Sequence, residues 1–147
     1  MMKKMLLLFG ILGVAGFLDT FYLTANHYSV ASLSCSVFNQ CDQVTSSSYS
    51  MWGNVPVAVA GMGYYTLLLL FTALAIWKNR KYFLFAAGTS IIGFFVSLWF
   101  LYLQLFVLQS LCTYCLISAL ISFILFGVSV SFFLERKVEK VTGIRKL

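Results

Sequence analysis

Four long apolar stretches dominate the chain and restrict the folds that it can adopt. They run from about Met5 to Ala25, Pro56 to Trp77, Tyr82 to Leu108 and Leu111 to Leu134. Each supplies the roughly 20 helical residues that cross a hydrocarbon core. Helices are expected because only helices and closed barrels satisfy every backbone group in lipid, and these stretches lack the alternation of barrel strands. The sequence therefore predicts an all-α membrane protein, with a single four-helix bundle over residues 1–147.

Composition and charge agree with this class. Only 10% of the residues are charged, whereas a soluble domain has about 25%. The net charge of +6 does not indicate nucleic acid, because the basic residues lie only at alternate ends of the four predicted spans. The positive-inside rule then predicts a plasma-membrane protein with both termini and the turn between the second and third spans in the cytoplasm. The three basic groups are Lys3 and Lys4; Lys78, Arg80 and Lys81; and Arg136, Lys137, Lys140, Arg145 and Lys146.

The loop from about Asn26 to Val55 carries no Lys or Arg, so the same rule places it on the outer side. Its apolar residues, among them Val44 and Trp52, are too many for a loose tether. We expect a short amphipathic helix around Asp42 to Ser50 that lies across the outer end of the bundle and screens its interior from water. The alternative is an interfacial anchor held by Tyr49 and Trp52.

The four cysteines form two close pairs, both predicted to lie on the outer side. Cys112 and Cys115 form a C-x-x-C motif at the start of the last span, with Ser110 as a candidate N-cap. Residues three apart on a helix lie about 5 to 6 Å apart, which suits a disulfide, and the helix dipole lowers the pKa of a thiol in the first turn. Cys35 and Cys41 would lie roughly 9 Å apart on a helix, beyond disulfide reach, so a bridge between them requires a closed loop.

Other interpretations of the four thiols remain open at this point. A structural disulfide is a common fate of two nearby extracytoplasmic cysteines such as Cys35 and Cys41. A four-thiolate zinc site is an alternative, although five residues between Cys35 and Cys41 exceed the usual two to four. Cys112 and Cys115 could also be inert core thiols. Two cysteine pairs on the same side of a small membrane protein favour a redox relay over these interpretations.

The first apolar stretch has an alternative reading as a secretory signal peptide, because Lys3 and Lys4 precede it. No small-x-small cleavage site follows it promptly, so we expect a retained helix. Gly10, Gly13 and Gly16 recur every three residues and would let a neighbouring helix approach closely.

Asp19 is an acid inside the first predicted span, which by default marks a functional site. The two functional roles that we consider for Asp19 are proton handling in a redox reaction and capping of the outer loop. The alternative is an ordinary hydrogen bond to helix or loop backbone.

These residues together resemble the prokaryotic branch of the vitamin K epoxide reductase family. The resemblance spans about Gly16 to Ser118 and places the loop pair of cysteines before the C-x-x-C, the reverse of the order in the bacterial disulfide-bond oxidase B family. The residues that carry it are Cys35, Cys41, Asp42-Gln43-Val44, Ser46 to Ser48, Tyr49, Gly53 to Val57, Gly61, Tyr64, Tyr65, Cys112 and Cys115.

The resemblance implies a quinone-dependent, protein-disulfide-forming oxidoreductase. Cys115 would contact the quinone, Cys112 would exchange with Cys41, and Cys35 would meet a thioredoxin-like partner. Ser47 would donate a hydrogen bond to the quinone, with Ser46 and Ser48 leaving that register open by one residue. The substrate would be ubiquinone or menaquinone, with no metal or flavin.

Two departures from the animal enzymes of the family argue against epoxide reduction. Ala119 stands where they have a Tyr, and Val57 stands where they have an Asn. Reduction of a plain quinone is therefore the expected reaction, with a quinone epoxide reductase as an alternative. We expect the thioredoxin-like partner to be a separate chain, because the segment after Leu134 is too short for that domain. A different class of function, a non-catalytic scaffold or transporter subunit with a structural loop disulfide, remains the main rival.

Overall fold

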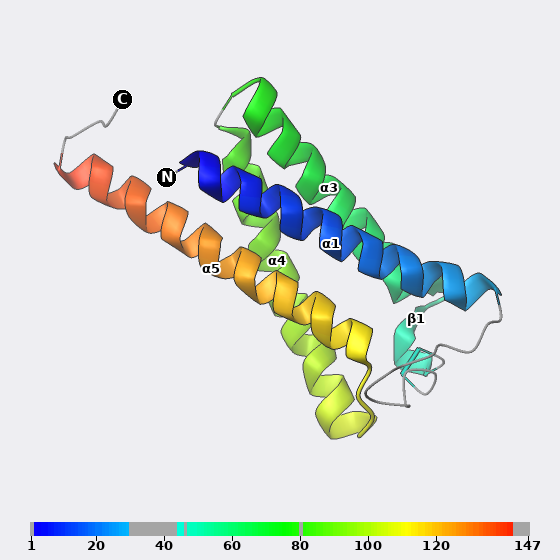
Figure 1. Ribbon diagram of the computed structural model, residues 1–147. Helices are drawn as coiled ribbons and strands as arrows, with labels where there is room; N and C mark the ends of the chain where they lie inside the picture. The colour runs from blue at the N-terminus through cyan, green and yellow to red at the C-terminus, as the bar shows by residue number, and fades with distance from the viewer. Residues whose placement is uncertain (1, 30–43, 46, 80, 143–147) are drawn as a thin grey trace.

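The computed structural model describes residues 2–29, 44–45, 47–79 and 81–142. Within them, four helices are long and apolar enough to cross a membrane, which confirms the predicted fold class (Figure 1). Their bounds agree with the predicted spans to within a few residues at most ends; the first and last helices extend further. The helices are α1 (Met2–Ser29), α3 (Val57–Trp77), α4 (Tyr82–Tyr102, continued by η2) and α5 (Thr113–Thr142).

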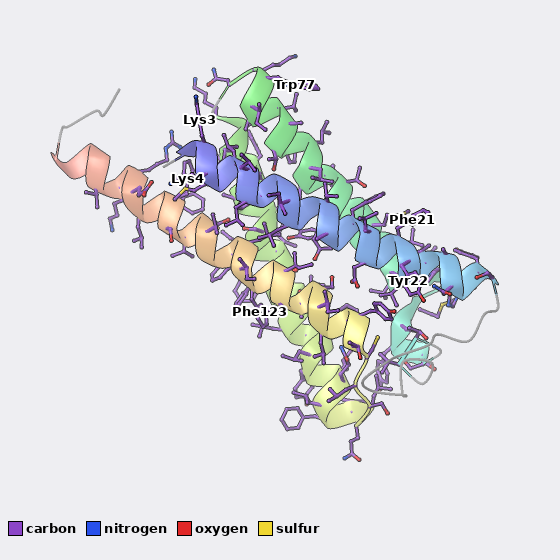
Figure 2. The ribbon with its side chains drawn as sticks, viewed as in Figure 1. Lys3, Lys4, Phe21, Tyr22, Trp77 and Phe123 are labelled. Atoms are coloured by element: carbon purple, nitrogen blue, oxygen red, sulfur yellow. The ribbon has the colours of Figure 1, made fainter. Side chains whose placement is uncertain are left out.

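The helices pack as two main pairs, α1 against α3 and α4 against α5, with further contacts between α3 and α4 and between α1 and α5. The bundle has two distinct ends (Figures 1 and 2). One, called the lysine end here, carries Lys3, Lys4 and the turn after Trp77. The other, called the cysteine end, carries the segment before α3, η2 and the start of α5 with Cys112. The start of α1, the end of α3 and the start of α4 thus lie at the lysine end, whereas the start of α3, the end of α4 and the start of α5 lie at the cysteine end.

Aromatic rings hold three helices together towards the lysine end. The ring of Phe9 on α1 meets Phe83 on α4 edge to face at 4.9 Å, and Phe83 meets Phe132 on α5 in the same way at 4.6 Å. All three side chains are buried. Edge-to-face pairs at these separations are favourable, so the three rings form an ordered core contact between α1, α4 and α5.

Small residues set how closely the helices approach. Gly16 of α1 lies against the ring of Tyr65, and Gly13 lies against Leu69 and Leu68. Gly10 has nothing within 4 Å of the position that a Cβ would take. The close helix approach predicted from the three glycines is therefore confirmed at Gly13 and Gly16 and wrong at Gly10.

The segment before α3 is compact over its described residues. Val44 and Thr45 are helical, the chain bends at Ser47, and η1 (Ser48–Ser50) is one turn of 3₁₀ helix. Strands β1 (Met51–Trp52) and β2 (Val55–Pro56) then form a small antiparallel hairpin. Its turn includes Gly53 at φ 66°, a conformation that glycine adopts without strain.

The amphipathic helix expected around Asp42 to Ser50 falls partly outside the described residues. In the described part, the serines explain why no long regular helix forms. The Ser47 hydroxyl donates to the Val44 carbonyl at 2.8 Å, and the Ser50 hydroxyl lies 2.5 Å from the Thr45 carbonyl and 2.7 Å from the Ser47 carbonyl. Such local bonds compete with helical backbone hydrogen bonds.

The helix α4 does not end as a regular α-helix. Its last turn widens into η2 (Leu103–Val107), a π-helix in which the Leu108 N–H reaches back five residues to the Leu103 carbonyl at 2.8 Å. Gln109 follows at φ 48° and turns the chain towards α5. This irregular connection places Cys112 directly before the first residue of α5.

Candidate functional site

Cys112 is the residue that caps the N-terminus of α5. The helix begins at Thr113, and the Cys112 carbonyl accepts the first helical hydrogen bond, from the Leu116 N–H at 3.0 Å. Ser110, the N-cap expected from the sequence, instead places its hydroxyl 3.1 Å from the Leu108 carbonyl. The expectation for Ser110 is therefore wrong, because the helix starts two residues later than that placement required.

The two thiols of the C-x-x-C motif are present as free thiols, with Cys112 buried and Cys115 half-buried. The spanning part of α5 starts at Thr113, so Cys112 lies just outside it. The pKa of Cys112 is lowered, first because its sulfur and the Cys115 thiol are hydrogen bonded, and further because the N–H groups of Cys115 and Tyr114 point to its sulfur. Burial and the carboxylate of Asp19 act in the opposite direction. Cys112 is thus suited to exist as a thiolate, the reactive form.

The loop segment covers this thiol. Val44 is only 7% exposed and forms a small apolar cluster with Cys112, which is 0% exposed. Leu108, Tyr114 and Cys115 pack around the two. Val44 comes three residues after Cys41 in the sequence. Part of the loop between α1 and α3 therefore lies directly on the thiol at the helix start.

Asp19 lies on the face of α1 that meets α3 and α5. One turn before it, Gly16 contacts the ring of Tyr65, and one turn after it, Tyr22 meets Tyr114 with ring centroids 5.0 Å apart. Its Oδ2 atom is buried and has no hydrogen-bond partner among the described residues. The structure thus places an unpartnered carboxyl oxygen between a contact of α1 with α3 and a contact of α1 with α5.

The remaining residues predicted for the site are Cys35, Cys41 and Ser47. Cys35 and Cys41 lie outside the described residues, and the zinc alternative that needs them lies there too. Ser47 is half-buried, and its hydroxyl hydrogen is directed to the Val44 carbonyl at 2.8 Å. To donate a hydrogen bond to a quinone, this hydroxyl would have to release the Val44 carbonyl; otherwise it could only accept one.

Two site residues were missed by the sequence reasoning. The Thr113 hydroxyl is buried at the first turn of α5 without a hydrogen-bond partner in the described part of the chain. Gln104, on η2, is 3% exposed and accepts a hydrogen bond from the Cys112 N–H at 3.0 Å. A glutamine inside an apolar span, eight residues before a C-x-x-C, was the available signal for Gln104.

The fold and the site define a class: a multi-pass membrane protein with a vicinal thiol pair at the start of one spanning helix, beneath the preceding loop. The sequence profile of the vitamin K epoxide reductase family matches residues 7–130. The chain belongs to this family.

A curated relative from Arabidopsis thaliana, named thiol-disulfide oxidoreductase LTO1, is 31% identical over 139 residues. The match covers 87% of this chain and 36% of the relative. The chain thus spans little more than a third of that protein's length.

Proposed function

We propose that this protein is a membrane thiol-disulfide oxidoreductase that passes electrons from a thioredoxin-like dithiol through Cys35 and Cys41, then Cys112 and Cys115, to a quinone. The observation that supports it most directly is Val44 packed on Cys112, because this contact brings the segment after Cys41 to the thiol pair of α5. Family membership and the name of the Arabidopsis relative support thiol-disulfide chemistry.

The handover between the pairs follows ordinary thiol-disulfide exchange. With Cys112 and Cys115 joined, the Cys41 thiolate attacks the Cys112 sulfur, the disulfide breaks, and Cys115 leaves as a thiolate. Cys35 then attacks Cys41, which releases the Cys112 thiolate and leaves Cys35 and Cys41 as a disulfide. A thiol of low pKa leaves faster, so the lowered pKa of Cys112 favours this second step.

The reduced Cys112 and Cys115 pair then gives two electrons and two protons to the quinone, which becomes the quinol while the disulfide re-forms. Asp19, with its buried and unpartnered Oδ2, is proposed to hold a proton or to lie against the quinone. The unpartnered Thr113 hydroxyl is available to donate a hydrogen bond to a quinone oxygen, as is Ser47 once it releases the Val44 carbonyl. The unsatisfied polar atoms of Asp19 and Thr113 fit a polar head group within an apolar bundle.

A plain quinone, ubiquinone or menaquinone, fits better than an epoxide. Ala119 is buried in α5, and Val57 opens α3. Neither side chain can hydrogen bond to a quinone oxygen, whereas the Tyr and Asn that the animal enzymes of the family carry at these positions can.

The re-oxidised pair of Cys35 and Cys41 would then accept electrons from a separate thioredoxin-like protein. That protein leaves in its oxidised form and is able to introduce disulfides elsewhere.

Thiol trapping in membranes tests the proposed function. Cells with normal quinone content and cells blocked in quinone synthesis are quenched in acid, and their thiols are labelled with a maleimide that adds mass. The proposal requires Cys112 and Cys115 to accumulate in the reduced form when quinone is depleted. An unchanged redox state of all four cysteines would reject the relay and favour a non-catalytic role with a structural disulfide.

A further inference from the structure

Gln104 occupies an unusual position in the bundle. It lies on η2, where the backbone widens to a π-helix, and its side chain is 3% exposed. Single π-turns within helices frequently occur at functional sites, because the extra residue changes the direction of the side chains that follow. The widened turn at the end of α4 therefore marks Gln104 as a candidate functional residue.

Gln104 holds the connection to α5 at two points. Its backbone carbonyl accepts a hydrogen bond from the Ser110 N–H at 3.1 Å. Its side-chain Oε1 accepts one from the Cys112 N–H at 3.0 Å, in a buried environment. Gln109, at φ 48°, turns the chain so that both donors face back to the same residue. One glutamine thus fixes the segment that ends in the reactive cysteine.

The second bond acts on the N-cap residue itself. An N-cap side chain stabilises a helix only when its backbone is held outside helical geometry while its side chain accepts from the first turn. In Cys112 the sulfur is this acceptor, and it accepts hydrogen bonds from the N–H groups of Tyr114 and Cys115. Because the Gln104 amide is neutral, it anchors the Cys112 backbone without adding negative charge beside a thiolate.

We propose that Gln104 is a positioning residue that holds the Cys112 backbone at the N-cap of α5 and thereby sets the reactivity of the Cys112 thiol. The effect on the thiol stands on the observed contacts, and only its consequence for electron transfer rests on the proposed function. The residue touches the backbone of Cys112 and takes no part in bond making. It acts by keeping the sulfur over the N–H groups that stabilise the thiolate.

The test compares three variants of the full chain in detergent, reduced and free of quinone. Gln104→Met keeps the volume and removes the acceptor, and Gln104→Asn keeps an amide but shortens its reach. Gln109→Met is the matched control, because Gln109 is exposed in the same connection. The readout is the pH profile of Cys112 alkylation by iodoacetamide, with the modified site assigned by mass spectrometry, alongside the thermal unfolding temperature.

Both Gln104 variants should shift the midpoint of the Cys112 profile upward by about one pH unit, which is about a tenfold slower reaction at pH 7. Gln109→Met should keep the wild-type midpoint. A lower unfolding temperature with an unchanged midpoint in both Gln104 variants would overturn the inference, since that is the result of a merely structural role. If Gln104→Met does not fold, Gln104→Asn decides the question alone.

The outcome is separable from that of the proposed function. A shifted profile in the Gln104 variants supports the positioning role even when the wild type reduces no quinone, in which case the relay is rejected and this inference stands. An unshifted profile rejects the positioning role even when the wild type reduces quinone readily.

Discussion

The hydroxyl of Tyr65 on α3 lies 3.1 Å from the hydroxyl of Ser118 on α5. Ser118 is three residues after Cys115, so it lies next to the thiol pair on the helix surface. The ring of the same tyrosine rests on Gly16 of α1. Tyr65 thus links three helices one turn below the cysteines, and the absence of a side chain at Gly16 permits this.

Replacing Gly16 by alanine should destabilise the bundle. A Cβ at this position would overlap the ring of Tyr65, which is 1% exposed and has no room to move. Overpacking of this kind costs about 1 to 3 kcal/mol. Gly10→Ala is the matched control, because nothing lies within 4 Å of its Cβ position. Thermal unfolding in detergent should show a lower transition temperature for Gly16→Ala only; equal transitions would contradict the packing described here.

The spanning helices could be predicted from the sequence because each is an apolar run bounded by strong signals. Pro56 precedes α3, and Lys78 follows it. The longer α1 and α5 extend beyond the predicted ends because the polar residues there, such as Asn26 and Glu135, continue a helix that has already left the apolar region. Hydropathy records the membrane crossing, not the end of the helix.

The detailed geometry around Cys112 could not be predicted in the same way. The choice between Ser110 and Cys112 as N-cap depends on where the chain leaves η2, and a π-turn has no periodic signature in the sequence. The contact of Gln104 with Cys112 depends on that turn as well. Cys112 and Cys115 were recognisable from spacing because a C-x-x-C is a local pattern, whereas residues that contact Cys112, such as Val44 and Gln104, come from other elements.

The lowered pKa of Cys112 predicts the pH dependence of its reactivity. The thiol is a stronger acid than an ordinary cysteine because Cys115 and the N–H groups of the first turn stabilise its thiolate. The alkylation rate should therefore rise with pH and reach half of its maximum below about pH 8.5, the usual cysteine value. Burial slows the reaction at every pH, and it also raises the pKa, but by less than the hydrogen bonds lower it.

Cys115→Ala provides the comparison for this pH profile. It removes the largest cause of the lowered pKa, the hydrogen bond between the two thiols. The midpoint for Cys112 should move upward in this variant, measured by site-assigned alkylation in detergent. A wild-type midpoint at or above that of Cys112 in the urea-unfolded chain would be inconsistent with a stabilised thiolate.

Val44→Ala should expose the Cys112 thiol. Val44 packs directly on it, and the truncation removes two methyl groups from the cover. We expect alkylation of Cys112 to become several-fold faster at fixed pH, since a thinner cover opens more readily. Val55→Ala on the exposed side of the hairpin is the control and should leave the rate unchanged. Equal rates in all three proteins would show that Val44 does not limit access.

The order of the relay can be tested with two single substitutions. Cys115→Ala should abolish quinone reduction, because Cys115 is the thiol proposed to contact the quinone. Cys35→Ala should block oxidation of a thioredoxin-like protein but retain quinone reduction with dithiothreitol, which reduces the inner pair directly. Quinol formation is followed by absorbance. Oxidation of the protein partner by Cys115→Ala at the wild-type rate would refute the assigned order.

The predicted sidedness places the cysteine end outside the cell and the lysine end in the cytoplasm. Ser48 and Asn79 are exposed residues near the opposite ends of the bundle. In a chain whose four native cysteines are replaced by serine, Ser48→Cys should react with a membrane-impermeant maleimide in intact cells. Asn79→Cys should react only after permeabilisation, because the basic residues around it are retained in the cytoplasm. The opposite labelling pattern would place the thiol pair in the reducing compartment, where a disulfide-forming relay could not work.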